Sequence, residues 1–171
     1  MKTDDEQLLL ATDRFTVVQV AERDAGTGVR QIIRHPGAVT IFPDLGDGRV
    51  CLIRNHRLSV DRTLLELPAG TLEPDEDPQD CAARELAEET GFRAERVEFV
   101  HAFFLSPGIL DERMHLFRAH GLSAGEPARE PGEQIENVIV SLEEAIDMIR
   151  GGQIEDAKTI VGLLYYERFC I

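Results

Sequence analysis

The sequence GTLEPDEDPQDCAARELAEETGF spans residues 70–92, and its second half predicts a helix. Asp77 is a favourable N-cap residue, and Pro78 suits the first helical position, where its missing N–H loses no hydrogen bond. Gly91 suits the exit, because glycine readily adopts the left-handed conformation that ends many helices. We therefore expect a helix over residues 77–90.

At about 100° per residue, this helix has a small, apolar face and a face with three carboxylates. The first face, suited to close packing on a sheet, holds Ala82, Ala83, Leu86, Ala87 and Thr90. The opposite face holds Glu85, Glu88 and Glu89, which repel one another and lie in the C-terminal half, where the helix dipole favours cations. Helix geometry alone leaves two interpretations. The glutamates form a solvated acidic face, as charge runs commonly do, or they bind a divalent cation through hard oxygen ligands.

The spacing of the whole segment favours the second interpretation. It resembles the Nudix box, Gx5Ex7REUxEExGU, in which U is apolar and x is any residue. All nine specified positions are filled, by Gly70, Glu76, Arg84, Glu85, Leu86, Glu88, Glu89, Gly91 and Phe92. So many residues at fixed spacing make a more specific signal than a short glycine motif. The resemblance implies a metal-binding loop–helix–loop of the Nudix hydrolase superfamily.

Nudix hydrolases use divalent metal ions to cleave nucleoside diphosphates linked to another group. The metal ligands that the resemblance implies are the backbone carbonyl of Ala69 and the carboxylates of Glu85, Glu88 and Glu89. Glu88 is also a candidate catalytic residue, whereas Arg84 and Glu76 are expected to support the geometry of the loop and helix. The expected metal is Mg²⁺, with Mn²⁺ as the alternative.

Three flanking stretches resemble the ADP-ribose pyrophosphatase branch of this superfamily. Residues 55–57 read NHR and precede LELPAG at residues 65–70, as QYR precedes LELPAG in that branch. The loop Ser106-Pro107-Gly108 has a proline at the spacing after the box that is characteristic of the branch. Residues 152–159, GQIEDAKT, resemble the entry of its C-terminal helix. GDP-sugar hydrolases share much of this pattern, including the Ser-Pro-Gly loop.

The same resemblance implies a set of substrate contacts. Arg57 is the candidate for holding a diphosphate, because a guanidinium can bind phosphate oxygens in a bidentate way; the alternative is an ordinary surface arginine. Phe15 and the N-terminal strands resemble the part of the branch that stacks the adenine and pairs with a second subunit. The remaining candidates are Glu66, Ser106, Pro107 and Gly108.

The general base is expected to come from an acidic loop. Family members usually draw a catalytic glutamate from a mobile loop before the last strand, and Glu130-Pro-Gly-Glu133 occupies that place. Glu133 is the better match by its distance to residues 141–144. Glu112, which follows the Ser-Pro-Gly loop, is the competing candidate for the base. Solvated loop acids are the alternative for both.

The rest of the chain predicts an α+β protein. Strands rich in β-branched residues are expected over residues 15–22, 28–33, 38–42, 50–54, 64–67, 97–105, 114–119 and 134–140, and further helices over residues 142–149 and 157–169. This order indicates a mixed sheet rather than alternating βαβ units. Together with the resemblance it predicts a Nudix fold, a mixed β-sheet sandwiched between helices, over residues 36–171. Residues 1–35 are expected to form a small antiparallel β subdomain that mediates dimerisation.

Composition and charge limit the function classes. With 43% hydrophobic and 29% charged residues the chain is globular, which excludes a disordered, collagen-like or coiled-coil protein. Its 18 basic and 32 acidic residues give a net charge of −14, which opposes binding to nucleic acid or to anionic membranes. No apolar run approaches the ~20 residues of a membrane span, and the acidic N-terminus lacks the basic region of a signal peptide. Three widely spaced cysteines without a CxxC pair lead us to expect a reduced, cytoplasmic protein.

The expected activity is metal-dependent hydrolysis of ADP-ribose to AMP and ribose 5-phosphate by a metal-activated water. The enzymatic alternative is hydrolysis of other nucleoside diphosphate sugars, such as GDP-mannose or ADP- and UDP-sugars. The alternative from another class is a Nudix-like sensor that binds a nucleotide without cleaving it. The intact array of glutamates argues against that alternative, because a module that only binds gains little from a crowded anionic helix. The expected partners are a small-molecule nucleotide sugar and a second copy of the chain.

Overall fold

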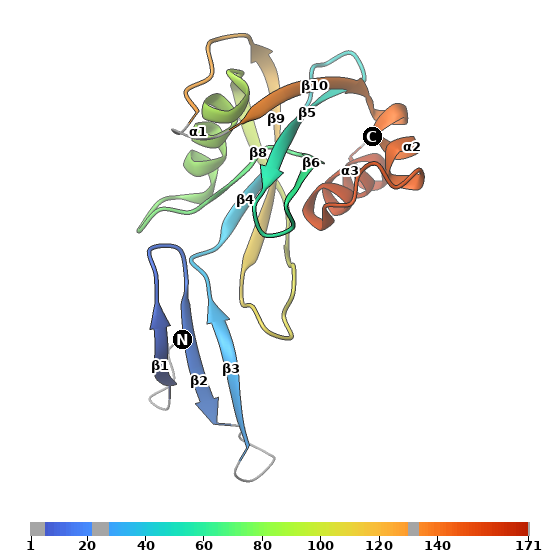
Figure 1. Cartoon of the computed structure of the whole chain (residues 1–171). Coiled ribbons are helices and arrows are strands. Elements are labelled where there is room, and N and C mark those ends of the chain that lie inside the picture. The colour runs from blue at the N-terminus through green and yellow to red at the C-terminus, as the bar shows by residue number, and fades with distance from the viewer. Residues whose placement is uncertain (1–5, 22–27, 130–133, 171) are drawn as a thin grey trace.

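A computed structural model describes residues 6–21, 28–129 and 134–170 of the chain. In these residues it contains three β-sheets and three helices (Figure 1). Glu133, the first candidate for the general base, lies outside the described residues.

The N-terminal part forms a sheet of its own, which extends away from the rest of the chain (Figure 1). Its antiparallel strands β1 (Glu6–Ala11), β2 (Thr16–Ala21) and β3 (Val29–Arg34) lie in the order β1-β2-β3. The turn between β1 and β2 is held by the Thr12 hydroxyl, which accepts the N–H of Phe15 at 3.0 Å and donates to its carbonyl at 2.8 Å. Sequence patterning missed β1, because Leu8, Leu9 and Leu10 are all exposed and show no alternation between a buried and an open face.

The strands of the larger body form two sheets. One has the order β7-β4-β9-β8 and consists of β7 (Ala69–Thr71), β4 (Ala38–Pro43), β9 (Arg113–Ser123) and β8 (Arg93–Phe104). Strands β4 and β9 are parallel, whereas the other neighbours in this sheet are antiparallel. The other sheet is antiparallel, with the order β10-β5-β6, and consists of β10 (Ile135–Ser141), β5 (Arg49–Arg57) and β6 (Arg62–Glu66). The predicted α+β fold with a mixed sheet is confirmed.

Strand β4 contributes to two apolar cores, because successive side chains of a strand point to opposite faces. Val39 and Ile41 belong to a core with Leu86 of α1 (Pro78–Thr90). Phe42 belongs to the other core, and its ring stacks on Tyr166 of α3 (Ala157–Phe169) with 3.7 Å between the ring centroids. Helices α2 (Leu142–Arg150) and α3 therefore lie on the side of the sheets away from α1 (Figure 1).

The ends of α1 follow the prediction. The Asp77 side chain caps the helix by accepting the N–H of Gln79 at 2.8 Å, and Gly91 ends it with a φ of 79°. The predicted packing face is partly wrong, because Ala83 is exposed whereas Glu89 is only 4% exposed. The helix is rotated so that Glu89 points towards the sheet, where the backbone N–H of Ala69 donates to its carboxylate.

The last two helices have well-formed N-termini. Ser141 and Glu144 form a reciprocal capping box at the start of α2. Asp156 caps α3 by accepting both the N–H and the hydroxyl hydrogen of Thr159, at 3.0 and 2.6 Å. Among the described helices, none has the length and apolar character that crossing a membrane requires.

Candidate active site

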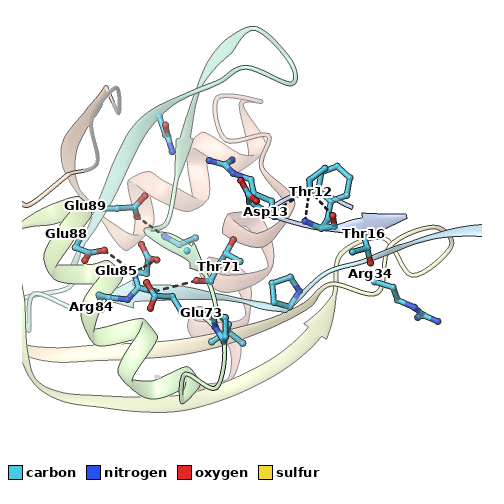
Figure 2. Close-up of a pocket in the computed structure, with 18 of the residues that line it drawn as sticks. Thr12, Asp13, Thr16, Arg34, Thr71, Glu73, Arg84, Glu85, Glu88 and Glu89 are labelled. Atoms are coloured by element: carbon cyan, nitrogen blue, oxygen red, sulfur yellow. Dashed lines mark hydrogen bonds and ion pairs between the residues drawn. The ribbon is translucent and has the colours of Figure 1, made fainter. Parts of the chain in front are cut away.

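A cavity of about 750 Å³ lies between α1 and the N-terminal sheet. Figure 2 shows the glutamates of α1 at one end of it, and the β1–β2 turn, marked by Thr12 and Asp13, at the other. Strand β5, strand β7 and the loop after β7 supply walls between these ends. The lining residues are Thr12 to Thr16, Arg34, Pro36, Asn55, Arg57, Ala69 to Pro74, Arg84, Glu85, Glu88 and Glu89.

Arg84 organises the acidic end of the cavity. Its Nε and Nη2 donate to both oxygens of Glu76, at 2.8 and 3.0 Å, in a bidentate fork. Its Nη1 donates to Glu85 at 2.7 Å and to Glu88 at 3.0 Å. One guanidinium thus holds three carboxylates that would otherwise repel one another, as expected for a residue that supports the loop and helix. The hydrogen bond from Arg84 lowers the pKa of Glu76 to about 2.

Glycine at position 70 is required by a close approach of the loop to the helix. A β-carbon added to Gly70 would lie 1.8 Å from the carboxyl carbon of Glu85. Next to it, the N–H of Ala69 donates to Glu89 at 2.9 Å, which accounts for the burial of that carboxylate. Glu89 and Glu85 therefore lie directly against the backbone of two consecutive residues of strand β7, Ala69 and Gly70.

Sequence analysis missed the contacts that hold the C-terminal end of α1. Asn137 of β10 donates from Nδ2 to the Thr90 carbonyl at 2.8 Å. Arg129 donates from Nε to the Glu89 carbonyl at 3.1 Å, which also places a positive charge at the negative end of the helix dipole. The last carbonyls of a helix have no partner within the helix, and these side chains supply partners. No local motif marked them, because they approach α1 from a distant part of the chain.

Arg57 lines the cavity, but Glu66 does not. Glu66 is fully buried and accepts from Arg57 Nε at 2.8 Å and from Arg57 Nη2 at 2.7 Å, and Lys158 pairs with the same carboxylate from α3. Burial opposes the ionisation of Glu66, yet the hydrogen bonds and charges of Arg57 and Lys158 hold its pKa below the usual value. The structure thus places Glu66 behind Arg57 and outside the cavity lining, and its expected substrate contact stays a prediction.

The remaining candidates divide into two groups. Phe15 lines the cavity, as do Ala69, Glu85, Glu88 and Glu89. In contrast, Ser106, Pro107, Gly108 and Glu112 are not among the lining residues. The Ser-Pro-Gly loop is instead docked on the end of β3, where Ile33 N–H donates to the Ile109 carbonyl at 2.8 Å. Glu112 lies beside His35, with Oε1 3.8 Å from Nδ1.

The acidic end of the cavity has the donor set of a hard-cation site. Three carboxylates and the backbone of Ala69 face it, and hard oxygens of this kind are the ligands that Mg²⁺ and Mn²⁺ prefer. In the part of the chain that the structure describes, no three acidic, histidine or cysteine side chains are grouped closely enough to hold a metal. Arg84 Nη1 stands between Glu85 and Glu88, so a bound cation would share these oxygens with it or replace it.

Comparison with known proteins identifies the family. The model of the NUDIX domain matches residues 34–161, which is most of the chain. The chain belongs to the Nudix family. This Nudix chain is 39% identical over 140 residues to the ADP-ribose pyrophosphatase of Bacillus subtilis (strain 168), covering 81% of the chain and 76% of that protein. It is 36% identical over 155 residues to a GDP-mannose pyrophosphatase of Yersinia enterocolitica, covering 83% and 81%.

A solved structure supports the fold independently. The crystal structure of an ADP compounds hydrolase matches with a TM-score of 0.80 over 99% of this Nudix chain and 96% of that one, at 21% sequence identity. The matches confirm the predicted membership of the Nudix hydrolases, with the ADP-ribose pyrophosphatase branch among its relatives, and the predicted Nudix fold. The individual roles of the site residues remain predictions.

We expect Gly70→Ala to disturb the cation site more than the fold. The added methyl group would displace the Glu85 carboxyl, which is the far end of a flexible side chain, so the free energy of unfolding should fall by about 1 kcal/mol, the low end of the usual cost of an extra methyl group. The affinity for Mn²⁺, measured by electron paramagnetic resonance, should fall by about 10-fold. Gly108→Ala is the steric control, since no atom lies within 4 Å of its added β-carbon. Unchanged Mn²⁺ affinity in Gly70→Ala would show that the loop and Glu85 are not coupled.

The paired Glu76 predicts a pH dependence of stability. Its pKa is about 2 in the folded chain against an ordinary value of 4.5, so the unfolded state binds more protons between these values. The stabilisation from Glu76 is complete above pH 4.5 and is lost as pH falls towards 2. The difference in unfolding free energy between the wild type and Glu76→Gln, measured in urea, should narrow across this window. A constant difference would refute the assignment.

Proposed function

We propose that this chain hydrolyses ADP-ribose to AMP and ribose 5-phosphate. The observation that carries the proposal is a single cavity that holds the glutamates of the Nudix helix at one end and an aromatic ring, that of Phe15, in its wall. Arg57, also in the cavity wall, offers a guanidinium of the kind that binds phosphate oxygens. The preference for ADP-ribose rests on the similarity to the Bacillus subtilis enzyme.

In the proposed reaction, different residues bind the diphosphate, bind the base and accept a proton. Arg57 binds an oxygen of the diphosphate, and Phe15 stacks on the base. Water attacks one phosphorus atom and forms a new P–O bond, while the bond from that phosphorus to the bridging oxygen breaks. A glutamate takes the proton of the attacking water, and the bridging oxygen leaves with the second phosphate group.

Glu85, Glu88, Glu89 and the Ala69 carbonyl would hold the divalent cation, for which we propose Mg²⁺ with Mn²⁺ as the alternative. When bound, such a cation neutralises phosphate oxygens and lowers the pKa of a water molecule. Among the three helix glutamates Glu88 is the most exposed, since its side chain is 37% exposed against 14% for Glu85, and Glu89 is buried; this suits a ligand that also contacts the reacting water.

For the general base we propose Glu133, with Glu112 as the competing residue. The place of Glu133 between two anchored segments supports this choice. Ala128 donates its N–H to the Glu88 carbonyl at 3.0 Å before the loop, and Asn137 binds the carbonyl of Thr90 after it. The chain is thus tied to the end of α1 on both sides of the acidic loop. Glu112, in contrast, lies beside His35 outside the cavity lining.

A second candidate function is hydrolysis of another nucleoside diphosphate sugar, above all GDP-mannose. The 36% identity to the Yersinia enterocolitica GDP-mannose pyrophosphatase favours it. The metal ligands and Arg57 would serve both substrates, since both contain a diphosphate. The choice between them depends on the far end of the cavity, at the β1–β2 turn, where the base or the sugar is held.

We also propose a reduced, cytoplasmic setting. All three cysteines are free thiols in the structure. Burial raises the pKa of Cys51 and of Cys81 to about 12. Thiols of this kind are unreactive and need no oxidising compartment. The expected exclusion of nucleic acid and membranes as partners rests on the net charge of −14.

The substrate proposal is tested with a panel of ADP-ribose, GDP-mannose, UDP-glucose, ADP-glucose and NADH. Phosphate released by added phosphatase is measured with Mg²⁺ for the wild type and for Glu89→Gln. We expect ADP-ribose to give the highest kcat/KM, and the variant to lose about 100-fold or more, because its amide cannot supply the charge of a carboxylate. Preferred turnover of another nucleotide sugar would support the proposed hydrolysis of a diphosphate but would replace ADP-ribose as the substrate. Binding without any turnover would favour a sensor.

We propose a homodimer formed through residues 1–35. Three leucines of β1 are 47 to 59% exposed, namely Leu8, Leu9 and Leu10, and an apolar run of this kind is suited to an interface. We expect light scattering at micromolar concentration to give the mass of two chains. Replacing all three leucines by Ser should give a monomer with an unchanged circular dichroism spectrum. A monomeric wild type would refute the dimer.

A further inference from the structure

Lys158 is a buried cation directly behind the wall of the cavity. It is the second residue of α3, only 6% exposed, and does not line the cavity. A buried lysine needs a charged partner, and Lys158 has two: its Nζ pairs with Glu66 Oε2 and lies 3.0 Å from Asp156 Oδ2. The lysine therefore joins the start of α3 to the end of strand β6.

Two cations share one carboxylate oxygen at this point. Glu66 Oε2 accepts from Lys158 Nζ and also from Arg57 Nη2, the latter at 2.7 Å. Lys158 and Arg57 are thus coupled through a single oxygen. Asp156, the second carboxylate paired with Lys158, lies at the N-terminus of α3, where the helix dipole favours a negative charge and the amide of Thr159 binds it. Lys158 therefore ties the carboxylate that binds Arg57 to the start of α3.

Arg57 is part of the cavity wall, and Glu66 fixes its orientation. Glu66 takes its Nε–H and one N–H of Nη2, so the plane of the guanidinium is fixed. Within the described ranges, no hydrogen bond is formed by Nη1, which leaves its N–H groups for a ligand. The side chain of Arg57 is 39% exposed and forms part of the cavity wall.

We infer that Lys158 is a positioning residue for the diphosphate of the substrate. By holding Glu66 in place, it keeps the guanidinium of Arg57 oriented for a phosphate oxygen. This inference rests on the proposed function and deepens it. The recognition of the substrate then depends on α3, on the side of the sheets opposite to the helix that carries the metal ligands.

A double-mutant cycle tests whether Lys158 acts through Arg57. Lys158→Met should lower kcat/KM for ADP-ribose about 10-fold, mostly through a higher KM, with kcat within about twofold of the wild type. Arg57→Met should lower kcat/KM about 100-fold. The double variant should be no worse than Arg57→Met, because the lysine has no effect without the arginine. Additive losses, or a loss in kcat alone, would overturn the inference.

Arg62→Met is the matched control. Arg62 lies on β6, the strand that carries Glu66, and pairs at 2.5 Å with Glu155, the residue before the α3 cap, but it is 60% exposed and does not line the cavity. This variant should keep the KM of the wild type. Urea unfolding shows whether each variant is folded, and Lys158→Gln replaces Lys158→Met if the latter is not. Failure of both to fold would assign Lys158 a structural role and overturn the inference.

A binding measurement separates this inference from the proposed function. Calorimetric titration with ADP-ribose in EDTA should give a dissociation constant about 10-fold higher for Lys158→Met than for the wild type. Binding without hydrolysis in a Mg²⁺ assay would refute the proposed activity, yet the ratio of the dissociation constants would still support the role of Lys158. A ratio near one would overturn that role whatever the activity. A wild type that neither binds nor hydrolyses ADP-ribose would overturn both.

Discussion

The repulsion among the acids at the end of the cavity is the constraint on which this site depends. Glu76, Glu85 and Glu88 come together around a single guanidinium, that of Arg84. A solvated acidic face would spread its charges apart, and here they converge on one cation with the loop backbone pressed against them. The arrangement is favourable only with positive charge at its centre, which explains why a helix with this many glutamates can be stable.

The segment of residues 66–70 connects this cluster to the rest of the fold, and nearly every residue in it has its own anchor. Glu66 binds Arg57 and Lys158, and the Leu67 N–H donates to the Thr159 hydroxyl at 2.8 Å. The Pro68 carbonyl accepts from Ile41 at 2.9 Å. The next two residues meet the glutamates of α1. Helices on opposite sides of the sheets thus fix one short stretch of backbone, and a shift in either helix would move the cation site.

Much of this was predictable from local sequence, and the failures have a common cause. The ends of α1 followed from Asp77 and Gly91, because caps are local hydrogen bonds. The burial of Glu89 was not predictable, because a helical wheel gives no information about the backbone N–H of Ala69 on a separate strand. The same holds for Glu66, whose partner Lys158 is distant in sequence. Motifs identify which residues matter, and tertiary contacts decide which of them face the substrate.

The pairing of the arginines has a consequence for how an anionic chain attracts an anionic substrate. Arg34, Arg57 and Arg84 all line the cavity, and each has at least one carboxylate partner among the described residues. Paired guanidinium groups orient a phosphate but add little attraction at long range, because their charges are largely cancelled. The attraction must come from charge that is not cancelled. The proposed divalent cation at the glutamates would supply it, whereas Lys158, which is paired with Glu66 and Asp156, would act by keeping Arg57 in place.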